Sequence, residues 1–299
     1  MADVVTVAIP VRDGGPLLDE VLAAVRAQRV DAEVELLVCD SGSRDGSVGI
    51  AKRHGAEVFQ IAPHEFSHGA TRNELVHRAA GKHVAFLTQD ATPADERWLQ
   101  RLLDGFGESE DVALTYGPYR PRPDAPPPVR RELDQWFSVQ APNGRNATVR
   151  LENAERLVAR SLIPQARMFF SDANGCVARR AWEEVPFRDV PYAEDRLLAA
   201  DLLARGYAKV YVPEAAVLHS HRYPPLQHLR RCFDEWRALN EIAGYVEPLS
   251  LVAVVGAVRA DGIASLPHHA SRAIGAALGS RAGRLPAGLT RRLSLEGRA

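Results

Sequence analysis

The run Asp40-Ser41-Gly42-Ser43-Arg44-Asp45-Gly46 follows an apolar stretch and combines two carboxylates with two glycines and two hydroxyls. A loop of this composition can approach a nucleotide closely and offer it backbone N–H groups. Asp40 would then accept hydrogen bonds from the base or the ribose. The run has neither the spacing of a P-loop nor that of a GxGxxG loop. A plain turn, in which Asp or Ser caps the next helix, is the open alternative.

Two further segments offer groups for a diphosphate and for a cation. Arg72 and Asn73 stand near the start of an expected helix, where the fork of an arginine suits a diphosphate. Helix capping with a surface ion pair is the alternative there. Asp90 ends the stretch Phe86-Leu87-Thr88-Gln89-Asp90, and hard divalent cations prefer oxygen ligands. A capping carboxylate is the alternative for Asp90.

A candidate proton acceptor and two imidazoles lie in the second half of the chain. Glu194 and Asp195 begin a strongly helical stretch. Compensation of the helix dipole explains acids at this place, but Asp195 can also act as a general base toward an acceptor hydroxyl. His219 and His221 follow a short apolar stretch at i and i+2, so both leave an extended backbone on the same side. One of them can bind a metal, and two solvated histidines are the alternative.

The elements that must position these residues alternate between strands and helices. Apolar stretches predict strands at 4–11, 34–39, 58–61, 84–87 and 112–116. Helical spacing appears between them, and Thr92-Pro93 predicts another helix start, because Thr caps well and Pro suits the first helical position. This alternation predicts an α/β fold with a mostly parallel central sheet flanked by helices. Ligands of such sheets bind at the carboxyl ends of the strands, where the polar segments lie.

Composition narrows the class of protein. The 299 residues hold 37 lysines and arginines against 38 acids, a net charge of −1, which argues against a general nucleic-acid binder. Cys39, Cys176 and Cys232 are widely spaced, which indicates a reducing compartment rather than a disulfide scaffold. We recognise no secretory leader and no apolar stretch of the roughly 18–20 residues that a membrane span needs. We therefore expect a cytoplasmic protein.

The end of the chain differs in composition from the rest. We expect one domain over residues 1–244 and a helical, basic tail over 245–299. Within 266–299, six arginines oppose a single acid, Glu296. Such a tail can touch an anionic membrane surface peripherally, and a solvated, partly disordered terminus is the alternative.

Taken in order, these segments resemble the motifs of family 2 glycosyltransferases with the GT-A fold, in their rhamnosyltransferase-like branch. The resemblance covers about residues 4–240. The matching stretches are Ile9-Pro10-Val11, Asp40 to Gly46, Glu65 to Asn73, Phe86 to Ala91, Pro121 to Ala125, Ala193-Glu194-Asp195 and His219-Ser220-His221.

The resemblance implies a role for each site residue. A nucleotide-sugar donor would be held by Pro10, Asp40, Ser43, Arg72, Asn73, Gln89, Asp90 and Asn174. Asp90 matches the last carboxylate of the family's DxD motif, which holds a divalent cation, Mg²⁺ or Mn²⁺, and His219 or His221 would assist it. Thr88 stands where the first Asp would be, a departure that leaves the cation fewer carboxylates. Asp195 matches the catalytic base.

The resemblance thus implies an inverting, metal-dependent glycosyltransferase. It would move a sugar, with rhamnose suggested, from a nucleoside-diphosphate donor to a hydroxyl of a glycan or a lipid-linked acceptor. The basic tail would place the protein peripherally at the inner face of a membrane. Two alternatives stay open. A sugar nucleotidyltransferase would carry a lysine-containing, glycine-rich loop after the first strand, which residues 10–15 lack. A non-catalytic carbohydrate-binding protein would not need Asp90, Asp195 and the histidine pair.

Overall fold

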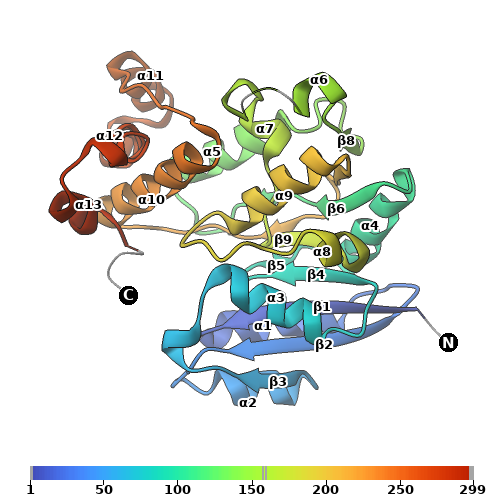
Figure 1. Cartoon of the computed structure of the whole chain (residues 1–299). Coiled ribbons are helices and arrows are strands. Elements are labelled where there is room, and N and C mark those ends of the chain that lie inside the picture. The colour runs from blue at the N-terminus through green and yellow to red at the C-terminus, as the bar shows by residue number, and fades with distance from the viewer. Residues whose placement is uncertain (1–2, 157, 159, 296–299) are drawn as a thin grey trace.

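The computed structural model describes residues 3–156, 158 and 160–295. Its centre is an eight-stranded sheet in the order β3-β2-β1-β4-β9-β6-β10-β8. In that order the strands are Glu57–Gln60, Glu33–Asp40, Val4–Val11, His83–Leu87, Asn174–Ala178, Val112–Tyr116, Ala208–Tyr211 and Ala147–Val149. Among these strands only β9 and β8 run antiparallel to their neighbours, so the expected mostly parallel α/β sheet is confirmed (Figure 1).

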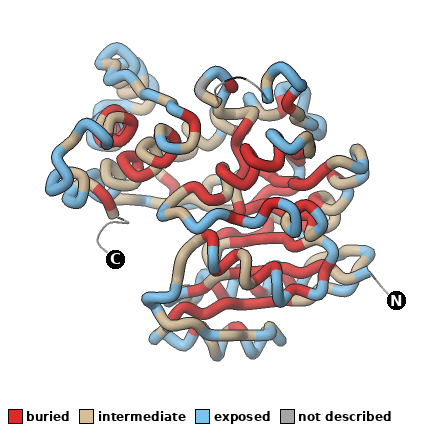
Figure 2. The backbone as a smooth tube through the Cα atoms, viewed as in Figure 1, coloured by how far each residue is buried: buried red, intermediate tan, exposed pale blue. Residues whose placement is uncertain are grey.

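Alternating side chains of the strands build a core on each face of the sheet. Val5, Val7 and Ile9 of β1 pack in one cluster with residues of α1 (Gly15–Arg26) and α4 (Trp98–Asp104). Ala8 faces the opposite cluster, with residues of α3 (His68–Arg78), α8 (Arg179–Glu184) and α9 (Glu194–Arg205). Figure 2 shows the buried residues concentrated along the strands and the inner faces of these helices. A strand buried on both faces explains the nearly continuous apolar runs of the sequence.

A second, three-stranded sheet joins distant segments beside the main one. It has the order β5-β11-β7, formed by Thr92–Pro93, Val217–Leu218 and Tyr119–Arg120. The expected helix start at Thr92-Pro93 is therefore wrong, and the next helix, α4, begins at Trp98. The Thr92 hydroxyl contacts Glu20 and Arg122 instead of capping a helix, because strand pairing with Val217 and Leu218, far along the chain, overrides the local signal.

The remaining α-helices lie between and after these strands. They are α2 (Ser47–Arg53), α5 (Pro127–Ser138), α6 (Asn153–Arg156), α7 (Gln165–Met168), α10 (Pro225–Ala243), α11 (Leu251–Asp261), α12 (Leu266–Gly279) and α13 (Ala287–Leu293). The described part of the expected tail is thus helical. Figure 1 shows α10, α12 and α13 gathered at one end of the molecule, with α11 projecting above them.

Two glycines bring α12 onto α10 at close range. A Cβ at Gly275 would lie 2.3 Å from the Leu229 carbonyl oxygen, and one at Gly279 would lie 2.2 Å from that of Phe233. Only glycine allows two helix backbones to approach so closely. Helix α10 begins at Pro225, shortly after His219 and His221, so the tail packs against the helix that follows these histidines in the chain.

Candidate active site

Asp90, His219 and His221 meet beside the small sheet. The His219 Nδ1 lies 3.5 Å from the Asp90 Oδ1, and the His221 Nδ1 lies 3.7 Å from the Asp90 Oδ2. The strand register explains the meeting, because Leu218 pairs with Thr92 in an antiparallel ladder. His219 follows Leu218 and therefore lies near Asp90, which precedes Thr92 by two residues. One ligand atom of each residue lies within 4.8 Å of the others. The three side chains thus lie together, and their binding of a metal stays a prediction.

The charges of this cluster suit a cation. Burial opposes ionisation of Asp90, yet the neighbouring imidazoles hold the pKa of its carboxyl below the usual value. Burial lowers the pKa of His219 and lowers that of His221 to about 4, which favours the neutral, ligating form of both rings. The buried Nδ1 of His219 has no hydrogen-bond partner among the described residues. An ionised carboxylate facing an unpartnered imidazole nitrogen fits a divalent cation.

Arg122 holds the backbone beneath this cluster, a role that the sequence did not reveal. Its guanidinium donates to the Asp90 carbonyl oxygen at 2.9 Å and to the Thr92 hydroxyl at 2.8 Å. The same side chain pairs with Glu20 at 3.1 Å. Arg122 comes from a proline-rich loop that sequence pattern alone would describe as a spacer, and its partners lie about 30 and 100 residues away.

Asp195 lies in the first turn of α9, after a residue with unusual backbone geometry. Ala193 has φ of +61°, which costs energy for any residue with a Cβ and is often found where function requires it. Burial, and then the nearby Asp172 carboxylate, raise the pKa of Asp195 to about 6. A carboxylate of this pKa stays ionised at neutral pH and is a stronger base than an ordinary aspartate.

Tyr119 connects Asp195 with the cluster around Asp90. Its ring packs edge-on against His219, with centroids 5.0 Å apart. Burial raises the pKa of the Tyr119 phenol, and the charge of Asp195 raises it further. Arg231 of α10 also spans this region, because it lies over the Tyr192 ring, 4.9 Å from its centroid, and its charge contributes to the low pKa of His221. Tyr119 is therefore a shared neighbour of Asp195 and of the cluster around Asp90.

Arg72 has a different environment from the one expected. It is buried, and its guanidinium pairs with the Asp172 carboxylate and, at 3.1 Å, with that of Glu194. Burial raises the pKa of Asp172 and of Glu194, and the charge of Arg72 opposes the rise in both. Arg72 thus fixes the start of α9 beside Asp195. Contact between Arg72 and a diphosphate stays a prediction, since both acids already occupy the guanidinium.

The loop after β2 is held by its own aspartate. Asp40 is buried, and its Oδ1 accepts hydrogen bonds from Gly42 N, Ser43 N and Gln60 Nε2 at 3.0–3.2 Å. The Ser43 hydroxyl accepts a hydrogen bond from Asp13 N at 2.8 Å. Half-buried Pro10 lies opposite Cys39 in the strand next to the loop. These bonds shape the loop, and a nucleoside contact by Asp40, Ser43 or Pro10 stays a prediction.

Three predicted donor-binding amides contact the protein backbone instead of open space. Asn73 bonds to both backbone groups of Phe187, and Gln89 bonds to both backbone groups of Arg12. Asn174 is fully buried and donates to the Pro118 and Ala215 carbonyl oxygens. Each amide fixes a loop near the cluster. Direct contact of these side chains with a donor stays a prediction and would require that they exchange partners.

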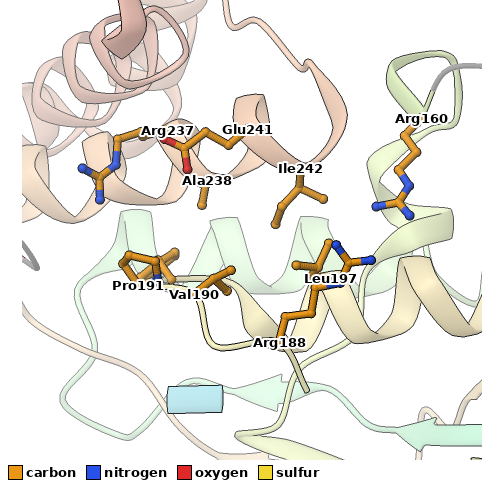
Figure 3. A pocket seen from close by; sticks show the side chains of 10 residues that line it. Arg160, Arg188, Val190, Pro191, Leu197, Arg237, Ala238, Glu241 and Ile242 are labelled. Atoms are coloured by element: carbon orange, nitrogen blue, oxygen red, sulfur yellow. The ribbon is translucent and has the colours of Figure 1, made fainter. Parts of the chain in front are cut away.

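A separate pocket of about 230 Å³ opens between α10 and the segment before α9. In Figure 3, Arg237 and Glu241 of α10 lie on one side and Val190 and Pro191 on the other. Asp90, Asp195 and the two histidines do not line it. The pocket is therefore a neighbour of the candidate site and not the site itself.

Comparison with known proteins identifies the class. The family model described as "Glycosyl transferase family 2" matches residues 6–177. The chain therefore belongs to glycosyl transferase family 2.

Two relatives are O-antigen chain rhamnosyltransferases from Salmonella. RfbN of Salmonella typhimurium (strain LT2) is 31% identical over 235 residues, which cover 77% of this chain and 70% of the relative. WbaN of Salmonella anatum is 31% identical over 204 residues, which cover 67% of this chain and 61% of the relative. The chain is thus similar to rhamnosyltransferases over most of its length.

Solved structures share the GT-A fold. The mannosyltransferase PcManGT from Pyrobaculum calidifontis, in complex with GDP-Man and Mn²⁺, has a TM-score of 0.57 at 18% identity, covering 98% of this chain and 81% of that one. TarS 1-349 of S. aureus in complex with UDP-GlcNAc has a TM-score of 0.55 at 14% identity, covering 94% and 91%. At these identities the likeness supports the fold. No helix in the described part of the chain is long and apolar enough to cross a bilayer.

Proposed function

We propose that this glycosyltransferase transfers a sugar with inversion from a nucleoside-diphosphate donor to a hydroxyl of a glycan or lipid-linked acceptor. Similarity to the two O-antigen rhamnosyltransferases favours rhamnose as the sugar. The observation that carries the proposal is the cluster of Asp90, His219 and His221, together with Tyr119, which packs on His219 and has Asp195 as a charged neighbour. That arrangement would supply a cation site and a proton acceptor for one reaction.

The residues of the chain would divide the reaction between them. Asp90, with His219 or His221, would hold Mg²⁺ or Mn²⁺, which neutralises charge on the departing diphosphate. Asp195 would take the proton of the acceptor hydroxyl, whose oxygen forms a bond to the anomeric carbon while the bond from that carbon to the diphosphate breaks. Attack from the face opposite the leaving group inverts the anomeric centre. Arg72 and Arg122 keep the two acidic segments in place.

A screen of sugar nucleotides tests this proposal. We expect one nucleoside-diphosphate sugar to raise the melting temperature of the protein and to be hydrolysed slowly, in both cases only with Mn²⁺ or Mg²⁺ present. If no sugar nucleotide binds under any of these conditions, the proposal is wrong. Release of pyrophosphate from a nucleoside triphosphate and a sugar phosphate would support a nucleotidyltransferase instead. Donor binding without any turnover, when tested with glycan acceptors, would support a carbohydrate-binding protein.

We also propose that the tail brings the enzyme to the inner face of an anionic membrane from the cytoplasm. Helix α11 has no buried residue, and Leu251 and Val252 are 73% and 84% exposed. The helices that follow add arginines of the basic segment, such as Arg272 of α12 and Arg291 of α13. An exposed apolar helix with nearby cationic side chains suits the interface of a bilayer.

The three cysteines are free and buried, which fits a reducing compartment such as the cytoplasm.

A further inference from the structure

We propose a second divalent-metal site, suited to Zn²⁺, between α5 and α12 and outside the glycosyl-transfer site. Its ligands are Glu132 of α5 and the adjacent His268 and His269 of α12. None of these residues is used in the function proposed above. The site would tie the tail to the helix that follows the proline-rich loop carrying Arg122.

The ligand atoms are spaced for a single ion. The His268 Nε2 lies 3.1 Å from the Glu132 Oε2, and the His269 Nδ1 lies 3.8 Å from the Glu132 Oε1. One ligand atom from each of the three residues lies within 4.8 Å of the others. Neighbouring ligands of tetrahedral zinc are about 3.3 Å apart, as bond lengths near 2.0–2.1 Å require. Two imidazoles and one carboxylate form a ligand set known for zinc, with a fourth position left for water.

A second shell orients one of the imidazoles, which is an independent sign of a metal site. His269 directs its Nδ1 toward Glu132, while its Nε2 lies 2.8 Å from the Asp261 Oδ2. The side chains of His269 and Asp261 are each only 5% exposed. Arg131 in turn holds the Asp261 carboxylate at 2.8 Å. A histidine that binds a metal almost always donates its other nitrogen to a carboxylate, a carbonyl or water.

Two side chains border the ligand atoms of the site. The His228 ring of α10 stacks on His268 with centroids 4.2 Å apart, which restrains the orientation of the His268 ring. One cation competes for the site, because the Arg272 Nε lies 3.7 Å from the Glu132 Oε1. The Arg272 side chain is 49% exposed and can turn into solvent when an ion binds.

Zinc binding by the full-length chain tests the proposal. The Asp90→Asn protein serves as the parent, because this substitution impairs the cluster near the small sheet. The parent is compared with variants that also carry Glu132→Gln, His268→Gln or Asp261→Asn. Each protein is stripped of metal with EDTA and titrated with ZnCl₂ by calorimetry. His77→Gln, which removes an exposed histidine of α3, is the matched control.

We expect the Asp90→Asn parent and its His77→Gln variant to bind one zinc ion with the same affinity. Glu132→Gln and His268→Gln should lose that ion, and Asp261→Asn should weaken its binding about 10–100-fold, as loss of an orienting partner does. Circular dichroism verifies that each variant is folded. As a second measurement, Co²⁺ should give the visible absorption of a tetrahedral site in the parent and not in His268→Gln.

Two results would overturn the proposal: a parent protein that binds no zinc, or a folded His268→Gln variant that binds zinc as the parent does. The first would mean that the cluster is a set of ion pairs joining α5 to α12. Neither result affects the proposed glycosyl transfer, because the titration measures a different group of residues.

Discussion

Asp90 is the residue on which a cation and a donor would depend together. It is the carboxylate at the centre of its cluster, and its two imidazole neighbours are neutral at physiological pH because burial lowers their pKa. The neutral imidazoles therefore do not repel a cation, and the negative charge that the cluster offers to it comes from Asp90. This makes the residue a sharper test of metal dependence than either histidine.

We predict that Asp90→Ala weakens donor binding in Mn²⁺ at least about tenfold, equivalent to about 1.4 kcal/mol. The loss would follow from removal of the carboxylate that we propose as a ligand of the cation. Calorimetry with and without EDTA measures it, and EDTA should have little further effect on the variant. Asp19→Ala, which removes a surface partner of His54, should bind the donor normally. A wild-type affinity that EDTA leaves unchanged would contradict the metal role.

At the scale of elements, α3 holds the segment that leads to Asp195. Arg72 pairs with Glu194, and Asn73 binds the backbone of Phe187. Gly69 completes the contact, since a Cβ there would lie 2.1 Å from the Arg188 carbonyl oxygen. The position of Asp195 therefore depends on close packing of one helix N-terminus against one loop.

We predict that Gly69→Ala destabilises the protein by about 1–3 kcal/mol, the usual cost of forcing atoms into a packed region, and that it also lowers kcat. Urea denaturation and a transfer assay measure the two effects. Gly49→Ala in α2 is the matched control, because its Cβ would meet nothing closer than 3.9 Å. That change should stabilise its helix by about 0.5–1 kcal/mol. Equal stability of the two variants would refute the packing argument.

The sequence predicted the elements better than the partners of their polar side chains. Apolar periodicity located the parallel strands, and the rule that ligands bind at strand ends indicated where Asp90 and His219 would meet. Local signals failed at Thr92-Pro93, where strand pairing with a distant segment decides the structure. They also could not show that Asn174 binds the carbonyl of Ala215, 41 residues away. Such partners follow from tertiary packing, which spacing along the chain does not encode.

The pairing of Arg72 with two acids is a similar case. The sequence singled out Glu194 beside Asp195, whereas it gave no signal for Asp172. The burial of both acids around one guanidinium could not be predicted, because it depends on segments that meet only in the folded chain.

At the scale of the whole molecule, the apolar helix α11 and the basic helices after it form one end of the fold (Figure 1). Because α12 packs closely on α10, deletion of residues 266–299 would expose part of the fold as well as remove charge. Point substitutions on α11 separate membrane contact from stability more cleanly.

We predict that the triple change Leu251→Ser, Val252→Ser and Val255→Ser lowers binding to vesicles that contain anionic lipid at least about tenfold, since each buried methylene contributes about 0.8 kcal/mol. Co-sedimentation measures the bound fraction, and salt should weaken the binding of the unsubstituted protein. Leu162→Ser, which changes a leucine that is 74% exposed outside the tail, should leave binding unchanged. Equal binding by the triple variant would exclude α11 as the contact.

The most direct test of the account is the pH dependence of glycosyl transfer in the wild type and in Asp195→Asn. Burial raises the pKa of Asp195 to about 6, and the base acts only when deprotonated, so the rate of the wild type should rise with pH through about 6 and then level off. Asp195→Asn should lose about 10²–10⁴-fold in kcat and lack this rise, while it still binds the donor. Asp189→Asn, an exposed change in the same segment, should behave as the wild type. An Asp195→Asn variant that transfers sugar at the wild-type rate with the same pH profile would contradict the assignment.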